Sequence, residues 1–225
     1  MFSKSVLALA AIALCGVLLG PRPASSQASA ENGEAAKQRK STKNEVTLQH
    51  ARERVDSILR EENGCSAWFR ETDPHAASVF ESLHIEIAQK SREYVQHMVD
   101  AKGANTYKHP WGARSNQLAG PGSFVEVNPQ GPFFVSSLPV VESSFGGPSL
   151  ISYSRYRNLT VGGFHGDSLE AQMTILLHEL AHVIGRIPVD DDSWDGRSTR
   201  NTEEVLRNCR SEIVDSTQKS LHAAN

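Results

Sequence analysis

Two histidines and a glutamate stand in an otherwise uncharged stretch of the sequence. His178, Glu179 and His182 form the pattern HExxH within the segment from Leu176 to Ile184. A helix would place the two imidazoles, just over one turn apart, on one face, where they can bind one zinc ion. Zinc lowers the pKa of water that it binds toward roughly 7, and a neighbouring carboxylate can accept the proton as that water attacks a carbonyl carbon. The sequence therefore predicts His178 and His182 as metal ligands and Glu179 as a general base.

Signals at both ends predict a helix around this motif. Asp167 or Ser168 can cap its N-terminus, Glu170 lies in the first turn, and Gly185 can end it. Apolar side chains surround the motif over much of the helix circumference, which is typical of a buried helix.

The HELAH helix resembles the active-site helix of the zincin class of metallopeptidases, most strongly over residues 168–185. The longer stretch through residues 201–209 is also similar to exported bacterial zincin-like proteins of poorly defined function. The resemblance implies an α+β fold, with one zincin-like domain in which a small mixed sheet lies beside the active-site helix and N- and C-terminal helices flank it. It also implies that an edge strand of the sheet binds extended substrate.

The third metal ligand departs from the familiar zincin patterns. A metzincin would continue as HExxHxxGxxH, and Gly185 matches the turn glycine, but Pro188 stands at the ligand position and cannot bind zinc. Asp190, Asp191 and Asp192 follow this position. A helix that ends at Gly185 frees the chain to turn back and present these carboxylates to the metal.

Gluzincins instead take a glutamate from a later helix, and Glu203 and Glu204 stand in the corresponding region. Glu204 has an alternative role as the capping-box partner of Asn201. Catalytic zinc usually takes three protein ligands and leaves one position for water, so one acidic ligand is expected. We favour Asp190, and the sequence leaves Glu204, Asp192 and Glu203 open as alternatives.

Three further helices are predicted from apolar periodicity and capping residues. The expected helices are Val46–Leu59, Pro74–Gln89 and Asn201–Leu221. The first ends before Asn63-Gly64, and the last has Asn201 as its N-cap. They provide the helices that would flank the active-site helix.

Short strands are predicted between residues 123 and 164, where apolar runs alternate with turn residues. The expected strands are Ser123–Val127, Phe133–Ser137, Leu150–Tyr156 and Leu159–Phe164. The first two form a candidate hairpin across residues 128–131, and the last two are candidate partners. Residues 103–122 are rich in Gly, Pro, Asn and Ser and are expected to form a loop.

A secretory signal peptide is predicted over residues 1–30. Lys4 provides a positive charge, Val6–Leu19 an apolar run, and Ala28-Ser29-Ala30 a small-residue cleavage site. The apolar run is shorter than the roughly 20 residues of a membrane-spanning helix. We therefore expect a secreted or periplasmic protein that has no stable membrane anchor once the signal is cleaved.

The remaining chain is expected to hold a disordered tether and one domain. Residues 31–44 are polar and almost without large apolar side chains, so they cannot order themselves by burial. The domain then spans residues 45–225. Its two cysteines, Cys65 and Cys209, are expected to form a disulfide, as is usual in an oxidising compartment, and no CxxC spacing supports the rival role as metal ligands.

The composition excludes a nucleic-acid partner. Lys and Arg number 23 and Asp and Glu 26, so the chain has no excess of basic residues. We therefore expect an exported zinc metallopeptidase, a hydrolase that acts on a peptide or protein substrate. Two alternatives remain open, a non-catalytic zinc-stabilised binding module and an amide hydrolase acting on cell-wall peptide.

Overall fold

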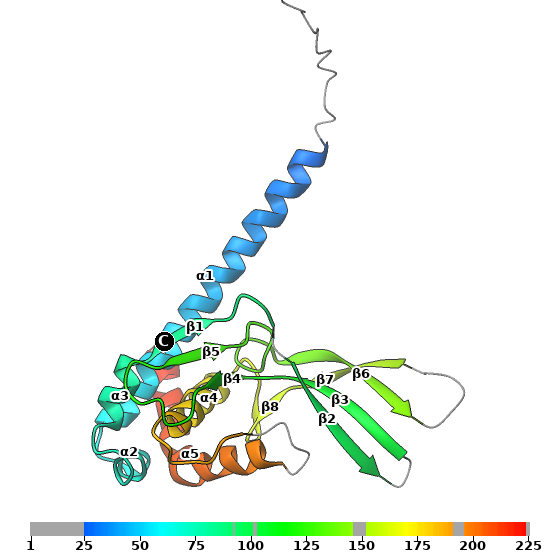
Figure 1. Ribbon diagram of the computed structural model, residues 1–225. Helices are drawn as coiled ribbons and strands as arrows, with labels where there is room; N and C mark the ends of the chain where they lie inside the picture. The colour runs from blue at the N-terminus through cyan, green and yellow to red at the C-terminus, as the bar shows by residue number, and fades with distance from the viewer. Residues whose placement is uncertain (1–24, 92, 101–102, 146–151, 191–195, 224–225) are drawn as a thin grey trace, which may run out of the picture. The chain divides into compact units, whose positions relative to one another are not determined.

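The computed structural model describes residues 25–91, 93–100, 103–145, 152–190 and 196–223 (Figure 1). The chain divides into two compact units, Met1–Lys40 and Ser41–Asn225. The second unit combines helices with small sheets, so the α+β class predicted from the sequence is confirmed. Most of the expected signal peptide lies outside the described residues.

The described helices are α1 (Ser25–Arg60), α2 (Gly64–Arg70), α3 (Ala76–Ser82), α4 (Leu169–Val183) and α5 (Arg197–Ala223). In the second unit, α1 buries the predicted apolar stripe except for Val46, which is exposed, and it ends before Asn63, as predicted. The buried residues of the stripe are Leu48, Ala51, Val55, Ile58 and Leu59. Asn63 then caps α2, a short helix that was not predicted.

The expected tether of residues 31–44 differs from the structure, which places this segment inside α1. The segment lacks large apolar side chains, but most of its residues are Glu, Ala, Lys, Gln or Arg, which have high helix propensity. Helix propensity therefore favours an ordered segment, although the lack of large apolar side chains predicted disorder.

The prediction of one helix over residues 74–89 is wrong. Helix α3 ends at Ser82, and His84–Ile87 forms strand β1. Along β1, exposed and half-buried residues alternate, which is the period of a strand. Ile85 and Ile87 lie two positions apart, on opposite faces of a helix but on the same face of a strand, so Ile87 fits the stripe of the predicted helix and Ile85 does not.

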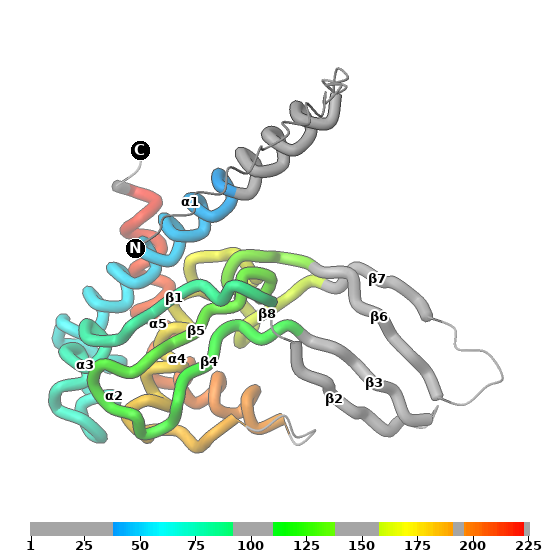
Figure 2. The backbone as a smooth tube through the Cα atoms, turned by 45° about the horizontal axis from the view of Figure 1, so that its top comes forward, coloured from blue at the N-terminus to red at the C-terminus, as the bar shows by residue number. Residues whose placement is uncertain are grey.

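Two of the described sheets contain more than two strands. The first has the order β1-β5-β4, in which β5 (Phe124–Val127) pairs in parallel with β1 and antiparallel with β4 (Ala113–Ser115). Figure 2 shows these three strands side by side. The second is antiparallel, in the order β2 (Glu93–Asp100), β3 (Gly103–Pro110), β6 (Ser137–Phe145) and β7 (Ser152–Asn158). A short hairpin joins β8 (Thr160–Val161) to β9 (Phe164–His165).

These pairings correct several expectations. Residues 133–135 are not a strand, because Phe134 and Val135 donate backbone hydrogen bonds to the Gly131 carbonyl in a turn. Phe133 is fully buried, so its apolar character reflects core packing in that turn. Strand β7 pairs with β6 and not with residues 159–164. The expected loop over residues 103–122 contains β3 and β4.

Helix α4 lies at the centre of the second unit's core. Ser168 accepts a hydrogen bond from the Ala171 amide as the N-cap, and every residue from Ala171 to Val183 is buried. Gly185 has φ +73°, a left-handed conformation that favours glycine and ends the helix. Both ends of α4 are therefore as predicted.

Helix α5 packs against α4 and is joined to α2 by the expected disulfide between Cys65 and Cys209. It begins at Arg197, so Asn201 lies inside it and is not its N-cap. Among the described residues, no helix has both the length and the apolar character required to cross a membrane.

Candidate metal centre

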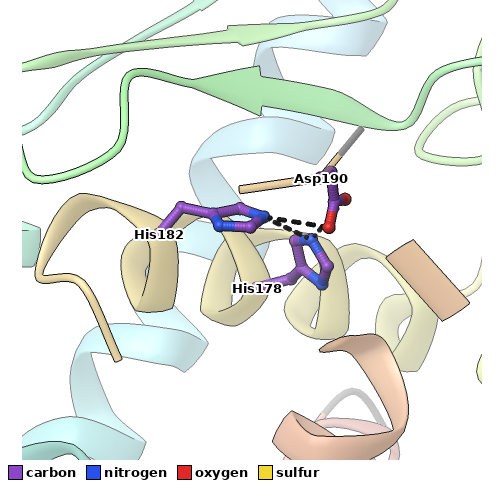
Figure 3. Close-up of side chains that lie close together, drawn as sticks. All are labelled: His178, His182 and Asp190. Atoms are coloured by element: carbon purple, nitrogen blue, oxygen red, sulfur yellow. Dashed lines mark hydrogen bonds and ion pairs between the residues drawn. The ribbon is translucent and has the colours of Figure 1, made fainter. Parts of the chain in front are cut away.

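Helix α4 presents His178 and His182 on one face. Their four-residue spacing turns both rings to the same side, and both side chains are almost fully buried (Figure 3). The two Nε2 atoms lie 3.0 Å apart. The imidazoles predicted from the motif are therefore brought together on a helix whose surroundings exclude most water.

Asp190 reaches the same point after the chain turns at Gly185. Its Oδ2 lies 3.0 Å from Nε2 of His178, and its Oδ1 lies 3.4 Å from Nε2 of His182. Ligand atoms bound at zinc distances around a tetrahedral centre lie about 3.3–3.4 Å apart. The two nitrogens and the carboxylate are thus spaced closely enough to share one metal ion, and His178, His182 and Asp190 form a candidate metal-binding group.

The electrostatics of this group favour an ionised carboxylate. Burial raises the pKa of Asp190, but hydrogen bonds from His178 and His182 outweigh it, so the net pKa is lowered. Burial lowers the pKa of His178, but the hydrogen bond and negative charge of Asp190, together with the charge of Glu179, raise it overall. A divalent cation bound at this group would replace the proton that His178 and Asp190 otherwise share.

Glu179 follows His178 on α4 and is also buried. Burial raises the pKa of its carboxyl group, and the two neighbouring imidazoles lower it by less, so the net direction is upward. Its Oε2 atom has no hydrogen-bond partner among the described residues. Burying a carboxylate oxygen without a hydrogen-bond partner costs free energy of folding unless a ligand, water or metal interacts with it. An oxygen left in this way is typical of a functional site.

Two residues of α5, neither of which was predicted at the site, contact the candidate ligands. The Asn201 amide donates to Oδ1 of Asp190 at 2.6 Å, and the Thr202 hydroxyl lies 3.2 Å from Nδ1 of His178. Asn201 had a local signal, its preference for N-caps, but that signal indicated a different role. Nothing in the local sequence marks Thr202, because its contact spans 24 positions.

The other predicted ligand candidates are not brought to this group. Glu204 forms an ion pair with Arg207, and Glu203 is exposed on α5. Asp192 lies outside the described residues. Cys65 and Cys209 are joined to each other and are not metal ligands.

Comparison of the chain with protein-family models, curated proteins and solved structures found no match. The chemistry of the site is therefore inferred from its own residues. Two imidazole nitrogens and one carboxylate oxygen form a donor set that suits zinc and related transition metals.

Proposed function

We propose that this protein is an exported zinc-dependent peptidase of the zincin type. The observation that carries the proposal is the meeting of two buried imidazoles and one carboxylate at separations of 3.0, 3.0 and 3.4 Å, beside a buried glutamate. Three such ligands are the usual number for catalytic zinc, which keeps a fourth position for water or substrate. A structural zinc site is usually closed by four protein ligands.

The proposed reaction is hydrolysis of a peptide bond. A bound zinc ion supplies a Lewis acid that polarises the carbonyl group and lowers the pKa of water. Glu179 accepts a proton from the attacking water as the water oxygen bonds to the carbonyl carbon. The carbon–nitrogen bond then breaks, and Glu179 delivers the proton to the leaving amine nitrogen. Its buried Oε2, which has no partner among the described residues, is available for this proton.

Strand β4 is the proposed binding edge for an extended peptide. It is the outer strand of the order β1-β5-β4, and the Ser115 hydroxyl donates to the Glu179 carbonyl at 3.2 Å. The Gly112 carbonyl accepts from the Asn128 amide on the β5 side. Because hydrogen-bonding directions alternate along an antiparallel pair, the main chain of Ala113 and Ser115 faces away from β5. A substrate strand can pair with these groups beside the metal-bearing helix.

The test is cleavage of an unbiased peptide library by zinc-loaded protein, with products identified by mass spectrometry. We expect cleavage that a chelator abolishes and added zinc restores. Glu179→Gln should keep one zinc per chain and lose cleavage by about 100-fold or more, because the amide cannot accept the proton. Glu170→Gln is the matched control on α4, since Glu170 lies in the first turn, away from the histidines.

Each other outcome has a defined meaning. Wild-type cleavage by Glu179→Gln would remove this residue from the mechanism. One tightly bound zinc without any cleavage would instead indicate a zinc-stabilised binding module. Release of peptide from purified cell wall, with no cleavage of the library, would indicate the amide hydrolase.

A further inference from the structure

Two consecutive residues of α5 contact two different candidate ligands. Thr202 contacts His178 and Asn201 contacts Asp190, and neither residue offers the imidazole, thiolate or carboxylate groups that usually bind zinc. Asn201 is buried, with a relative exposure of 5%. The role of Asn201 and Thr202 follows from the groups to which each donates a hydrogen bond and from which each accepts one.

The Thr202 hydroxyl has one hydrogen, and it donates that hydrogen to the Ser198 carbonyl at 3.0 Å. Toward Nδ1 of His178, at 3.2 Å, the same oxygen can then only accept. Nδ1 must therefore carry a proton, and in the neutral imidazole, which is the form that binds a metal, Nε2 then has the lone pair. Nε2 is the atom that faces His182 and Asp190, so this tautomer is the one that can bind the metal.

The Asn201 amide nitrogen has two hydrogens, and both are used. One is donated to the Pro188 carbonyl at 2.8 Å and the other to Oδ1 of Asp190 at 2.6 Å. These bonds hold the backbone before Asp190 and its carboxylate in one arrangement. Oδ2 then stays directed at His178.

Helix α5 is itself held firmly, which allows it to position other groups. Val205 and Leu206 are buried against the core one turn after these residues, and Cys209 is joined to Cys65 of α2. His182 provides a contrast, because its Nδ1 is buried without a hydrogen-bond partner among the described residues. The support from α5 thus acts on His178 and Asp190.

We propose that Thr202 and Asn201 are positioning residues of the metal centre. Thr202 selects the His178 tautomer that leaves Nε2 free to bind the metal, and Asn201 fixes the Asp190 carboxylate. The inference rests on the metal site of the proposed function, but it does not depend on hydrolysis. Outer hydrogen-bond partners of this kind typically change metal affinity by about 10–100-fold.

The experiment measures zinc affinity of the metal-free protein by competition with a chromophoric chelator. Thr202→Val removes the acceptor at nearly constant volume, and Thr202→Ser restores a hydroxyl. Thr217→Val is the matched control, because Thr217 makes the same bond to the carbonyl four residues earlier on α5 but lies far from the site in sequence. Asn201→Leu is paired with Asn208→Leu, since the Asn208 amide donates to the Glu204 carbonyl on its own helix.

We expect Thr202→Val and Asn201→Leu each to weaken zinc binding by about 10–100-fold. Thr202→Ser and both controls should stay within about threefold of wild type. Melting temperatures of the metal-free Thr202→Val and Thr217→Val proteins should agree, so that a loss of affinity is not a loss of folding. The visible spectrum of bound Co²⁺ should change in Thr202→Val and be recovered in Thr202→Ser, which a general effect on helix stability would not produce.

Wild-type affinity in both Thr202→Val and Asn201→Leu would overturn the proposal. A loss of affinity in Thr202→Ser equal to that in Thr202→Val would overturn the role of the hydroxyl. Failure of the wild-type protein to bind zinc would remove the metal site itself, and the positioning roles with it. A wild-type protein that binds zinc but cleaves nothing would leave the positioning roles standing while the proposed peptidase function fails.

Discussion

Replacement of Asp190 by alanine should remove most of the thermal stabilisation that zinc gives the protein. In the structure, Asp190 is the acidic group that completes the set formed by His178 and His182. The second unit spans Ser41–Asn225, and for a domain of this size about 1 kcal/mol corresponds to a shift of about 2–4 °C in melting temperature.

The expected magnitude follows from the binding equilibrium. Zinc at 100 times its dissociation constant stabilises the folded protein by about 2.7 kcal/mol, which predicts a rise of about 5–11 °C in the wild type. Loss of a ligand should cost at least the upper end of the effect of an outer partner, about 100-fold. At the same zinc concentration the variant would then gain only about 0.4 kcal/mol, or about 1–2 °C.

The assay is a thermal melt of each protein with chelator and with buffered zinc. Glu204→Ala is the matched control, because the Glu204 carboxylate pairs with Arg207 on α5 and is not part of the metal-binding group. Its zinc-dependent shift should equal that of the wild type. A full shift in Asp190→Ala, or a lost shift in Glu204→Ala, would refute the assignment of Asp190 as the third ligand.

Two predictions concern the framework that holds this site. Replacing Cys65 and Cys209 together by serine should lower the free energy of unfolding by about 2–5 kcal/mol, because the bridge closes a long loop between two buried positions. Urea titration measures this change, and equal urea midpoints for the variant and the wild type would contradict it. Gly131→Ala should cost about 1–3 kcal/mol, because a Cβ there would overlap the Trp111 carbonyl oxygen, whereas Gly64→Ala should be nearly neutral, since its Cβ would make only ordinary contacts. A urea midpoint of Gly131→Ala equal to that of the wild type would show that the backbone of this turn shifts to accept the Cβ without a cost in stability.

Helix α4 could be predicted because its signals are local. Ser168 and Gly185 mark its ends, and the apolar residues around the HExxH motif indicate burial whatever the rest of the fold does. The return of Asp190 toward the histidines also follows from a nearby feature, the left-handed turn at Gly185. For this helix, the predictions that depend on a few adjacent residues agree with the structure.

The contributions of α5 could not be predicted, because they depend on contacts between distant segments. Asn201 has the residue type of an N-cap, yet its amide bonds with Pro188 and Asp190 while it lies inside the helix. The start of α5 four residues earlier removes the cap role, and no local preference signals the alternative. Thr202 is equally unmarked until the fold brings it to His178.

Strand β1 shows the same limit for the sheet. Ile87 continues the apolar stripe of the preceding helix and Ile85 breaks it, but two apolar residues are too few to establish the period of a strand. What selects the strand is its pairing with β5, whose residues lie far along the sequence. Pairing partners at such separations are not encoded in the spacing of either segment.

The most direct test of the central claim is a crystal structure of the zinc-loaded protein with anomalous diffraction recorded at the zinc absorption edge. We expect one anomalous peak per chain, about 2.0–2.2 Å from Nε2 of His178, Nε2 of His182 and a carboxylate oxygen of Asp190, with a remaining position open to water. Absence of zinc at this group, or a peak bound by Glu203 or Glu204 in place of Asp190, would contradict it.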